Sequence, residues 1–106
     1  MSQQPTPAFR FVVHVMPKAG ILDPQGRAVE RSMPHLGVTE VSGVRVGRRV
    51  ELTVAAADAD AARAIVERLA GELLANPLIE THATELVGAV AGGTVAGVGG
   101  AGEGAA

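Results

Sequence analysis

The sequence predicts a two-layer α+β domain in which two helices pack on an antiparallel sheet. Three observations support this class: the segments follow the order β-α-β-β-α-β, both helical segments are amphipathic, and the strand segments alternate apolar and polar residues. The chain has 106 residues and only two aromatic residues, so the core is aliphatic and small. We therefore expect a homodimer or a larger assembly to complete the domain.

The first strand is predicted over residues 9–16, which are rich in valine and phenylalanine. Alternate side chains of a strand point to opposite faces of its sheet. One face is therefore expected to supply the core, with Phe9, Phe11, Val13 and Val15.

A turn and a helix start follow the first strand. Gly20 permits a turn conformation that other residues resist. Asp23 can cap a helix, and Pro24 suits the first helical position, so a helix is predicted over 24–36. Pro34 removes one backbone hydrogen bond, so we expect a kink there or an early end of the helix.

Two strands are predicted over 40–46 and 48–56, on either side of a turn at Gly47. The second of them has one apolar and one wetter face, because Val50, Leu52 and Val54 alternate with polar residues.

A second helix is predicted over 58–75 and a last strand over 78–86, separated by Asn76 and Pro77. The helix carries one apolar stripe, which is expected to cover the sheet. Its members are Ala62, Ile65, Val66, Leu69 and Leu73.

These elements place one domain over residues 9–86. Residues 1–8 are polar and contain prolines, and we expect a flexible N-terminus there. Residues 87–106 hold eight glycines, which predicts a flexible Gly/Ala-rich tail and not a membrane span.

Composition excludes several classes of function. The chain has no cysteine, which excludes disulfides, thiolate catalysis and thiolate metal sites, and is compatible with a cytoplasmic protein. Aromatic platforms for stacking bases are missing, and a net charge of −2 gives no general attraction to nucleic acid or anionic membranes.

The residues show no catalytic, cofactor-binding or metal-binding constellation. His14, His35 and His82 lack the spacing of a metal motif. Lys18 begins a Lys-Ala-Gly run beside the helix start, but the Walker spacing is absent and Asp23 lies where a phosphate would bind. We therefore expect no catalytic residue, bound cofactor or metal in this chain.

Three loops are the candidate partner contacts, because binding residues concentrate on loops. An alternative is that Asp23, Pro24 and Asn76 serve only as caps and turn formers. The arginines near Gly47 likewise suit either a phosphate, a partner protein or a solvated turn. The candidate residues are Lys18, Asp23, Pro24, Gln25, Gly26, Arg48, Arg49, Asn76 and Pro77.

Five short sequence segments, taken in their order and spacing along the chain, resemble the sequences of one family. They are LDPQGRAVE at 22–30, HLG at 35–37, VSGVRVGR at 41–48, VEL at 50–52 and LLANPLIE at 73–80. Together they are similar to the PurS family, the small subunits of phosphoribosylformylglycinamidine synthase, over residues 9–86.

The resemblance implies a non-catalytic subunit of an ATP- and glutamine-dependent C–N ligase complex, acting in the fourth step of de novo purine biosynthesis. It implies a subunit that joins a large synthetase subunit to a glutaminase subunit and supports ammonia transfer between them. ATP and Mg²⁺ are then expected on the synthetase, and neither nucleic acid nor membrane is an expected partner.

Two other functions remain open at this point. Ferredoxin-like domains that bind small molecules as regulatory modules share this order of elements, and fold alone does not separate the two. RNA binding through an open sheet face is a third possibility, which the missing aromatics and the acidic balance disfavour.

Overall fold

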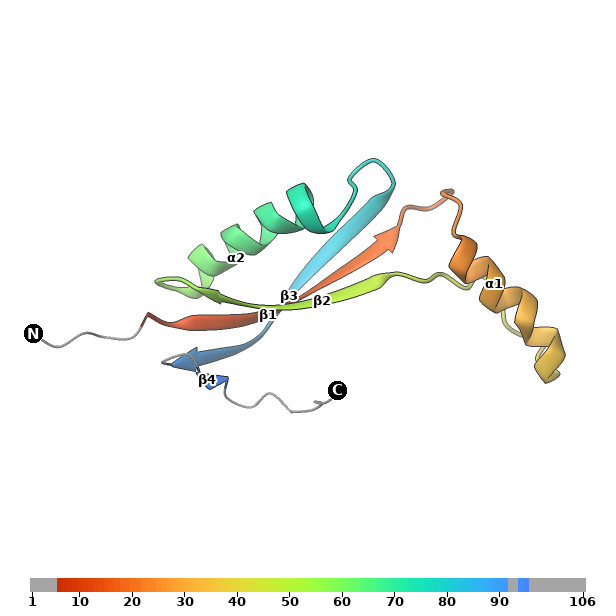
Figure 1. The fold of residues 1–106 in the computed structure, drawn as a ribbon, viewed down its shortest axis with the longest axis horizontal. Helices are drawn as coiled ribbons and strands as arrows, with labels where there is room; N and C mark the ends of the chain where they lie inside the picture. The colour runs from red at the N-terminus through yellow and green to blue at the C-terminus, as the bar shows by residue number, and fades with distance from the viewer. Residues whose placement is uncertain (1–5, 92–93, 96–106) are drawn as a thin grey trace, which may run out of the picture.

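The computed structural model describes residues 6–91 and 94–95, and its centre is a four-stranded antiparallel sheet (Figure 1). The strand order is β2-β1-β3-β4, so the first strand lies inside the sheet and β2 forms one edge. The predicted α+β class with an antiparallel sheet is confirmed. The strands are β1 Ala8–Pro17, β2 Arg48–Ala55, β3 Glu80–Ala91 and β4 Thr94–Val95.

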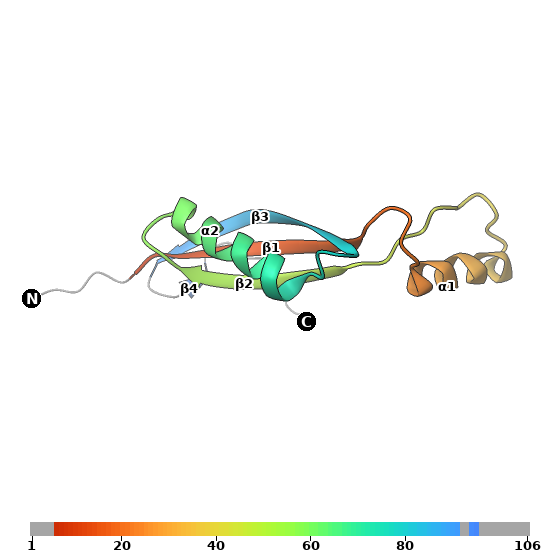
Figure 2. The same ribbon diagram turned by 90° about the horizontal axis from the view of Figure 1, so that it is seen from above.

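Helix α2, Ala59–Leu69, lies across one face of this sheet (Figures 1 and 2). It begins where the Asp58 side chain accepts a hydrogen bond from the Ala61 backbone N–H at 2.8 Å. Small residues on its inner side allow close approach to the strands. The core consists of Phe11, Val13, Val15, Val54, Ala56, Ala62, Val66, Ala70 and Ala75, with Phe9, Val50, Leu52 and Leu74 packed at its border.

The predicted core face of the first strand is therefore confirmed, but part of the predicted stripe of the second helix is wrong. Ile65 is 42% exposed and Leu73 is 74% exposed. The helix ends in a π-helical turn, η2, Ala70–Leu74. A π turn is wider than an α turn, so the residues in it rotate away from the α-helical stripe and Leu74 packs inward in place of Leu73.

Helix α1, Pro24–Ser32, stands beyond the end of the sheet, whereas the sequence predicted it on the sheet (Figures 1 and 2). Gly26 is its only buried residue. The reason is that its few apolar side chains meet no sheet within the protomer. The early helix end expected at Pro34 is confirmed, because a 3₁₀ turn, η1, Met33–Leu36, replaces the last part of the α-helix.

The predicted strand over 40–46 is wrong for the single protomer, because this segment pairs with no strand among the described residues. One residue, Gly47, is too short for a hairpin turn, so the chain continues from the segment directly into β2. A Cβ at Gly47 would collide with the backbone oxygen of Val15 and the sulfur of Met16. Glycine thus lets the chain pass close to β1.

The sheet also extends past the predicted domain end at residue 86. β3 continues to Ala91 and β4 lies inside the predicted flexible tail, because the first residues of β1 supply a partner for residues 88–90. Ala8, assigned to the flexible N-terminus, is buried in β1. The remaining predictions of flexibility, for 1–5, 92–93 and 96–106, lie outside the described residues. No helix in the described part is long and apolar enough to cross a membrane.

Candidate functional site

The three predicted contact loops meet at one end of the sheet, between the sheet and α1. The Lys18 backbone N–H donates to the Ile79 carbonyl at 2.8 Å, which joins the first loop to the last turn. A hollow of about 480 Å³ opens between them. It is lined by residues of all three regions, including Leu22, Asp23, Pro24, Gln25, Arg48 and Ile79.

Asp23 lies at the centre of this end of the molecule. One carboxylate oxygen accepts from the Gly26 N–H at 3.0 Å, and the other accepts from the Val46 N–H at 2.9 Å. These bonds, the one from Gly26 first, lower the pKa of Asp23. Asp23 therefore caps α1, as the sequence indicated, and also fastens the helix to the segment that leads into β2.

Two further features hold α1 against this segment. Gly26 leaves no room for a side chain, because a Cβ there would collide with the Val44 carbonyl oxygen and the Asp23 carboxylate. Glu30 accepts from the Val44 N–H at 2.7 Å. We call residues 23–46 the arm, because helix and segment form one connected unit projecting from the sheet (Figure 2).

Among the candidate residues, Arg48 makes several side-chain hydrogen bonds at once. Its guanidinium binds both oxygens of Glu80, at 2.9 and 3.1 Å, and donates to the Leu74 carbonyl at 2.7 Å. Glu80 also accepts from the Asn76 N–H at 2.7 Å. The pKa of Glu80 is lowered, chiefly by Arg48, and the pKa of Arg48 is raised by Glu80. We call this group the Arg48 clamp.

The turn held by the Arg48 clamp presents apolar side chains to solvent. The Asn76 side chain accepts from the Leu78 N–H at 3.1 Å, so Asn76 is a turn former as the alternative interpretation proposed. Leu78 is 82% exposed at the tip of the turn. A structural role for Asp23, Pro24 and Asn76 is thus visible, while partner contact by the candidate set stays a prediction.

Arg49 does not join the other candidates. It lies on the opposite sheet face and pairs with Glu51 at 3.2 Å, and Glu51 also binds Arg10. The charged side chains of β1 and β2 lie on this face. The remaining candidate residues lie around the arm and the turn at Asn76.

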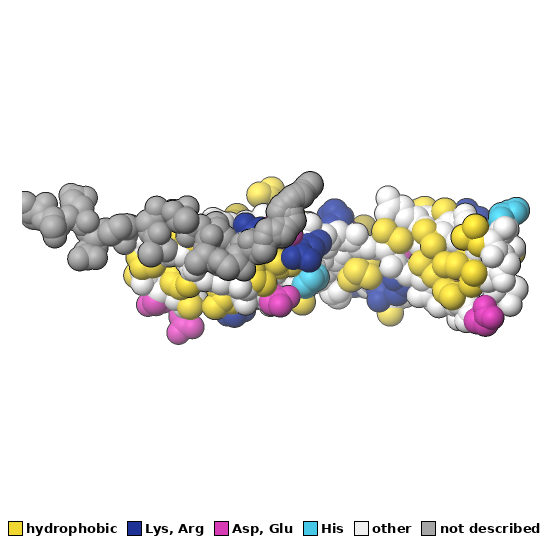
Figure 3. Space-filling model, turned by 90° about the horizontal axis from the view of Figure 1, so that it is seen from below, with side chains coloured by type: hydrophobic (Ala, Val, Ile, Leu, Met, Phe, Trp, Pro, Cys, Tyr) yellow, Lys and Arg dark blue, Asp and Glu magenta, His cyan; other side chains and the backbone are white. Residues whose placement is uncertain are grey.

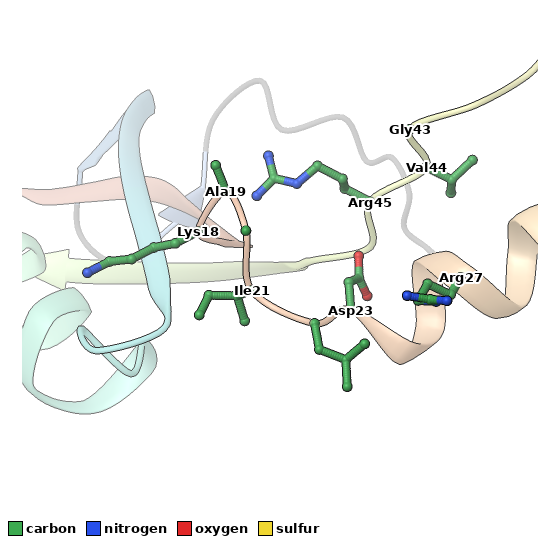
Figure 4. A pocket seen from close by; sticks show the side chains of 10 residues that line it. Lys18, Ala19, Ile21, Asp23, Arg27, Gly43, Val44 and Arg45 are labelled. Carbon is green, nitrogen blue, oxygen red and sulfur yellow. The ribbon is translucent and has the colours of Figure 1, made fainter.

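A second hollow, of about 600 Å³, lies between the first loop and residues 43–45 (Figure 4). Lys18, Arg27 and Arg45 line it together with Asp23. In this view the Lys18 amine points away from Arg27, and the guanidinium groups of Arg45 and Arg27 lie apart, so the positive charges do not converge on one point. The arrangement lacks the focused donors that bind a phosphate group.

Two of the three histidines contact carboxylates, and His35 lies in the arm. His82 Nε2 is 3.1 Å from Glu67, which also accepts from the Thr84 hydroxyl. These contacts, Thr84 first, lower the pKa of Glu67 and connect α2 to β3. His14 is 3.4 Å from Glu85. Among the described residues, no three metal-binding side chains come together.

Sequence reasoning missed Glu30 and Glu80, the two acids that organise the site. Their partners lie 14 and 32 residues away in the chain. Helical spacing and capping rules detect only neighbours within a few residues, so no local signal could have found these pairs.

Comparison with known proteins identifies a family. The family described as PurS, phosphoribosylformylglycinamidine (FGAM) synthase, matches residues 10–88. The chain is 46% identical over 71 residues to phosphoribosylformylglycinamidine synthase subunit PurS of Mycobacterium leprae, which covers 67% of this chain and 86% of the relative.

Solved structures agree with the sequence match. The PurS subunit of phosphoribosylformylglycinamidine synthase from Thermotoga maritima superimposes with a TM-score of 0.71 at 28% identity, covering 81% of this chain and 97% of that one. A chain in the PurLQS structure from the same organism gives 0.70 at 29% identity, covering 76% and 98%.

Proposed function

This chain belongs to the PurS family of phosphoribosylformylglycinamidine synthase, and we propose that it is the non-catalytic subunit that joins the synthetase and glutaminase subunits and supports ammonia transfer between them. The synthase is a ligase complex of purine biosynthesis, and this chain is one of its subunits.

The observation that carries the proposal is the nearly complete match to a chain of the PurLQS structure, of which 98% is covered. The arrangement of side chains supports it. The conspicuous polar groups hold backbone together, as Asp23 and the Arg48 clamp do, and the loops that they hold are exposed. We place ATP and Mg²⁺ on the synthetase subunit and the whole assembly in the cytoplasm.

We also propose that the chain forms a homodimer in which the arm of each copy completes the sheet of the other. Exposed apolar side chains gather on the arm, where Val29, Leu36 and Val41 are 41%, 77% and 47% exposed (Figure 3). Among the described residues, the sheet is covered by α2 alone and does not include the strand that the sequence predicts over 40–46. A second copy would supply a second helix and this strand, since each copy carries an unpartnered arm and an incomplete sheet. Val50 and Leu52, half-buried at the edge of the core, would then be covered.

Reconstitution tests the function. Purified synthetase and glutaminase subunits are assayed for glutamine-dependent synthesis of formylglycinamidine ribonucleotide with and without this chain, and ammonia-dependent synthesis is measured in parallel. The expected result is that the chain restores the glutamine reaction and changes the ammonia reaction little.

If neither rate changes, the bridging function is wrong. Thermal shift of the free chain with amino acids and nucleotides would then test the regulatory-module alternative, which requires a ligand-dependent rise in melting temperature.

A further inference from the structure

We propose that the free edge of β3, residues 81–86, binds an extended segment of one partner subunit as an added antiparallel strand, with a basic side chain opposite Glu85. This inference rests on the proposed function, because a subunit that joins two different proteins needs a separate surface for each. The three contact loops beside the arm form one such surface, and β3 lies on the other side of β1 from β2. The occupant of the edge is therefore the subunit that the loops do not bind.

The hydrogen-bonding phase of the sheet shows which backbone groups of β3 are available. The Lys18 N–H donates to the Ile79 carbonyl, so these two residues form a hydrogen-bonded pair. Such pairs alternate along an antiparallel ladder, so residues 81, 83 and 85 bond to β1 in the observed register. The residues whose N–H and carbonyl groups point outward are His82, Thr84 and Leu86.

The outward groups of this edge meet no strand among the described residues. β4 pairs with β3 only at Val90 and Ala91. Natural proteins blunt a free edge with lysine, proline or a very short strand. β3 has 12 residues, and its segment Thr-His-Ala-Thr-Glu-Leu contains neither lysine nor proline. The edge therefore has the form of a template for a further strand.

Helix α2 holds this edge in place on one face of the sheet. Glu67 accepts from the Thr84 hydroxyl and lies 3.1 Å from His82 Nε2. Arg63 donates to the Thr84 hydroxyl oxygen at 3.3 Å, and its Cζ lies 5.5 Å from the centroid of the Phe11 ring. Because these side chains are already paired, the edge is ordered before a partner arrives, which lowers the cost of binding.

The opposite face of the edge supplies the charge that selects the occupant. The Glu85 side chain is 61% exposed, and its carboxylate is 3.4 Å from His14. Opposite charges on directly opposed residues stabilise an antiparallel pair. Leu86 and Val87 come next along the strand and are 38% and 43% exposed. A segment with a basic residue opposite Glu85 and an apolar residue opposite Leu86 therefore fits this edge.

Hydrogen exchange tests the edge directly, because its amides fall into two groups. The chain is compared free and in the reconstituted complex with the synthetase and glutaminase subunits, and exchange is read by NMR after quenching. We expect the amides of residues 82 and 84 to exchange roughly tenfold more slowly in the complex. The amides of residues 81, 83 and 85 are the internal control, because β1 protects them in both states.

Two substitutions at Thr84 isolate the outward N–H group. Thr84→Pro removes this donor without removing a bond to β1, and an edge strand tolerates proline at such a position. Thr84→Val keeps the N–H and removes only the hydroxyl contacts with Glu67 and Arg63. In sedimentation velocity with each subunit, Thr84→Pro should weaken binding of one subunit roughly tenfold more than Thr84→Val does.

A charge reversal leaves the backbone intact and provides a further measurement. Glu85→Arg should weaken binding of the same subunit roughly fivefold. Glu72→Arg on α2 is the matched control, because the Glu72 side chain is similarly exposed, at 67%, and should leave binding unchanged. Arg48→Ala should instead weaken binding of the other subunit.

The outcomes separate this proposal from the proposed function. Slow exchange at residues 82 and 84 in the free chain overturns the partner strand, because a second copy or another part of the same chain then covers the edge. Unchanged exchange in a complex that restores glutamine-dependent synthesis overturns the edge and leaves the bridging function standing. Loss of the same subunit from both Glu85→Arg and Arg48→Ala overturns the division into two surfaces. If the original chain restores no synthesis, the bridging function itself is wrong.

Discussion

The sheet with α2, which we call the body, and the arm are stabilised by different forces. In the body, Phe11, Val13 and Val66 are fully buried and packing dominates. In the arm, only Gly26 of α1 is buried, and carboxylate-to-backbone hydrogen bonds hold helix and segment together. A hydrogen bond contributes about 0.5–1.5 kcal/mol net, whereas burying one large apolar side chain contributes about 1.5–3 kcal/mol. The arm therefore keeps its shape locally but depends on another surface for stability.

The largest expected effect on stability comes from truncating a side chain at the centre of the body. Phe11→Ala should destabilise the chain by about 3–5 kcal/mol, because the ring is fully buried and leaves a cavity. Urea unfolding followed by circular dichroism measures this loss. The matched change in the arm, Leu36→Ala, should leave unfolding of the isolated protomer nearly unchanged, since Leu36 is 77% exposed. Equal losses for the two variants would contradict the division into body and arm.

A methyl group inside the arm should break it while sparing the body. Gly26→Ala forces a Cβ against the Val44 carbonyl and the Asp23 carboxylate, and overpacking of this kind costs about 1–3 kcal/mol. We expect weaker dimerisation in sedimentation and a loss of glutamine-dependent activity in the reconstituted complex.

Gly71→Ala is the control for this variant, because the nearest atom to a new Cβ there is 4.0 Å away. If both alanine variants dimerise like the original chain, the close contact at Gly26 is not what holds the arm.

The Arg48 clamp stands between the two regions, so its removal should affect assembly more than folding. The double variant Arg48→Ala/Arg49→Ala should weaken assembly with the synthetase and glutaminase subunits while the dimer stays folded. The single variants separate the two arginines. Arg48→Ala should account for the weaker assembly, because it releases the turn at 75–79, whereas Arg49→Ala removes only an ion pair on the surface. Analytical gel filtration at physiological salt measures assembly, and an unchanged complex would remove this end from the contact surface.

The smallest effect on stability is expected from lowering the pH. Asp23, Glu67 and Glu80 have lowered pKa values when folded, so the unfolded chain binds their protons more tightly. Their stabilisation is present above the ordinary values, 3.8 for Asp and 4.5 for Glu, and is lost as the pH falls below them through the folded pKa values.

Urea unfolding between about pH 7 and about pH 3 tests this loss. Glu67→Gln should flatten the pH dependence of the body, and Asp23→Asn should flatten that of dimerisation. A steep dependence that persists in both variants would assign the effect to other carboxylates.

The sequence predicted those parts of the fold that depend on neighbouring residues. Alternation along β1 identified the core face, and Asp23 caps the first helix where the sequence indicated. It failed where the outcome depends on distant partners. The segment at 40–46 has strand-forming residues but no strand partner in the part of the protomer that the structure describes, and α1 has an apolar stripe that covers no sheet there.

The candidate site shows the same division. The three contact loops were predicted from turn residues, and the structure brings them to one end of the sheet. The acids that arrange them, Glu30 and Glu80, could not be recognised, because an acidic residue on a predicted helix or strand is ordinarily solvated.

Gly47 has a mechanical consequence for the assembly. It joins β2 of the body to the extended segment of the arm, while the loop after β1 makes the arm's other connection. A Cβ at Gly47 would collide with the Val15 carbonyl oxygen and the Met16 sulfur. A segment of eight residues extends about 26 Å, so a rotation of about 10° at Gly47 would displace its far end by roughly 4–5 Å. A side chain at this position would therefore move the segment away from β1, so the position of the arm depends on the close passage at Gly47.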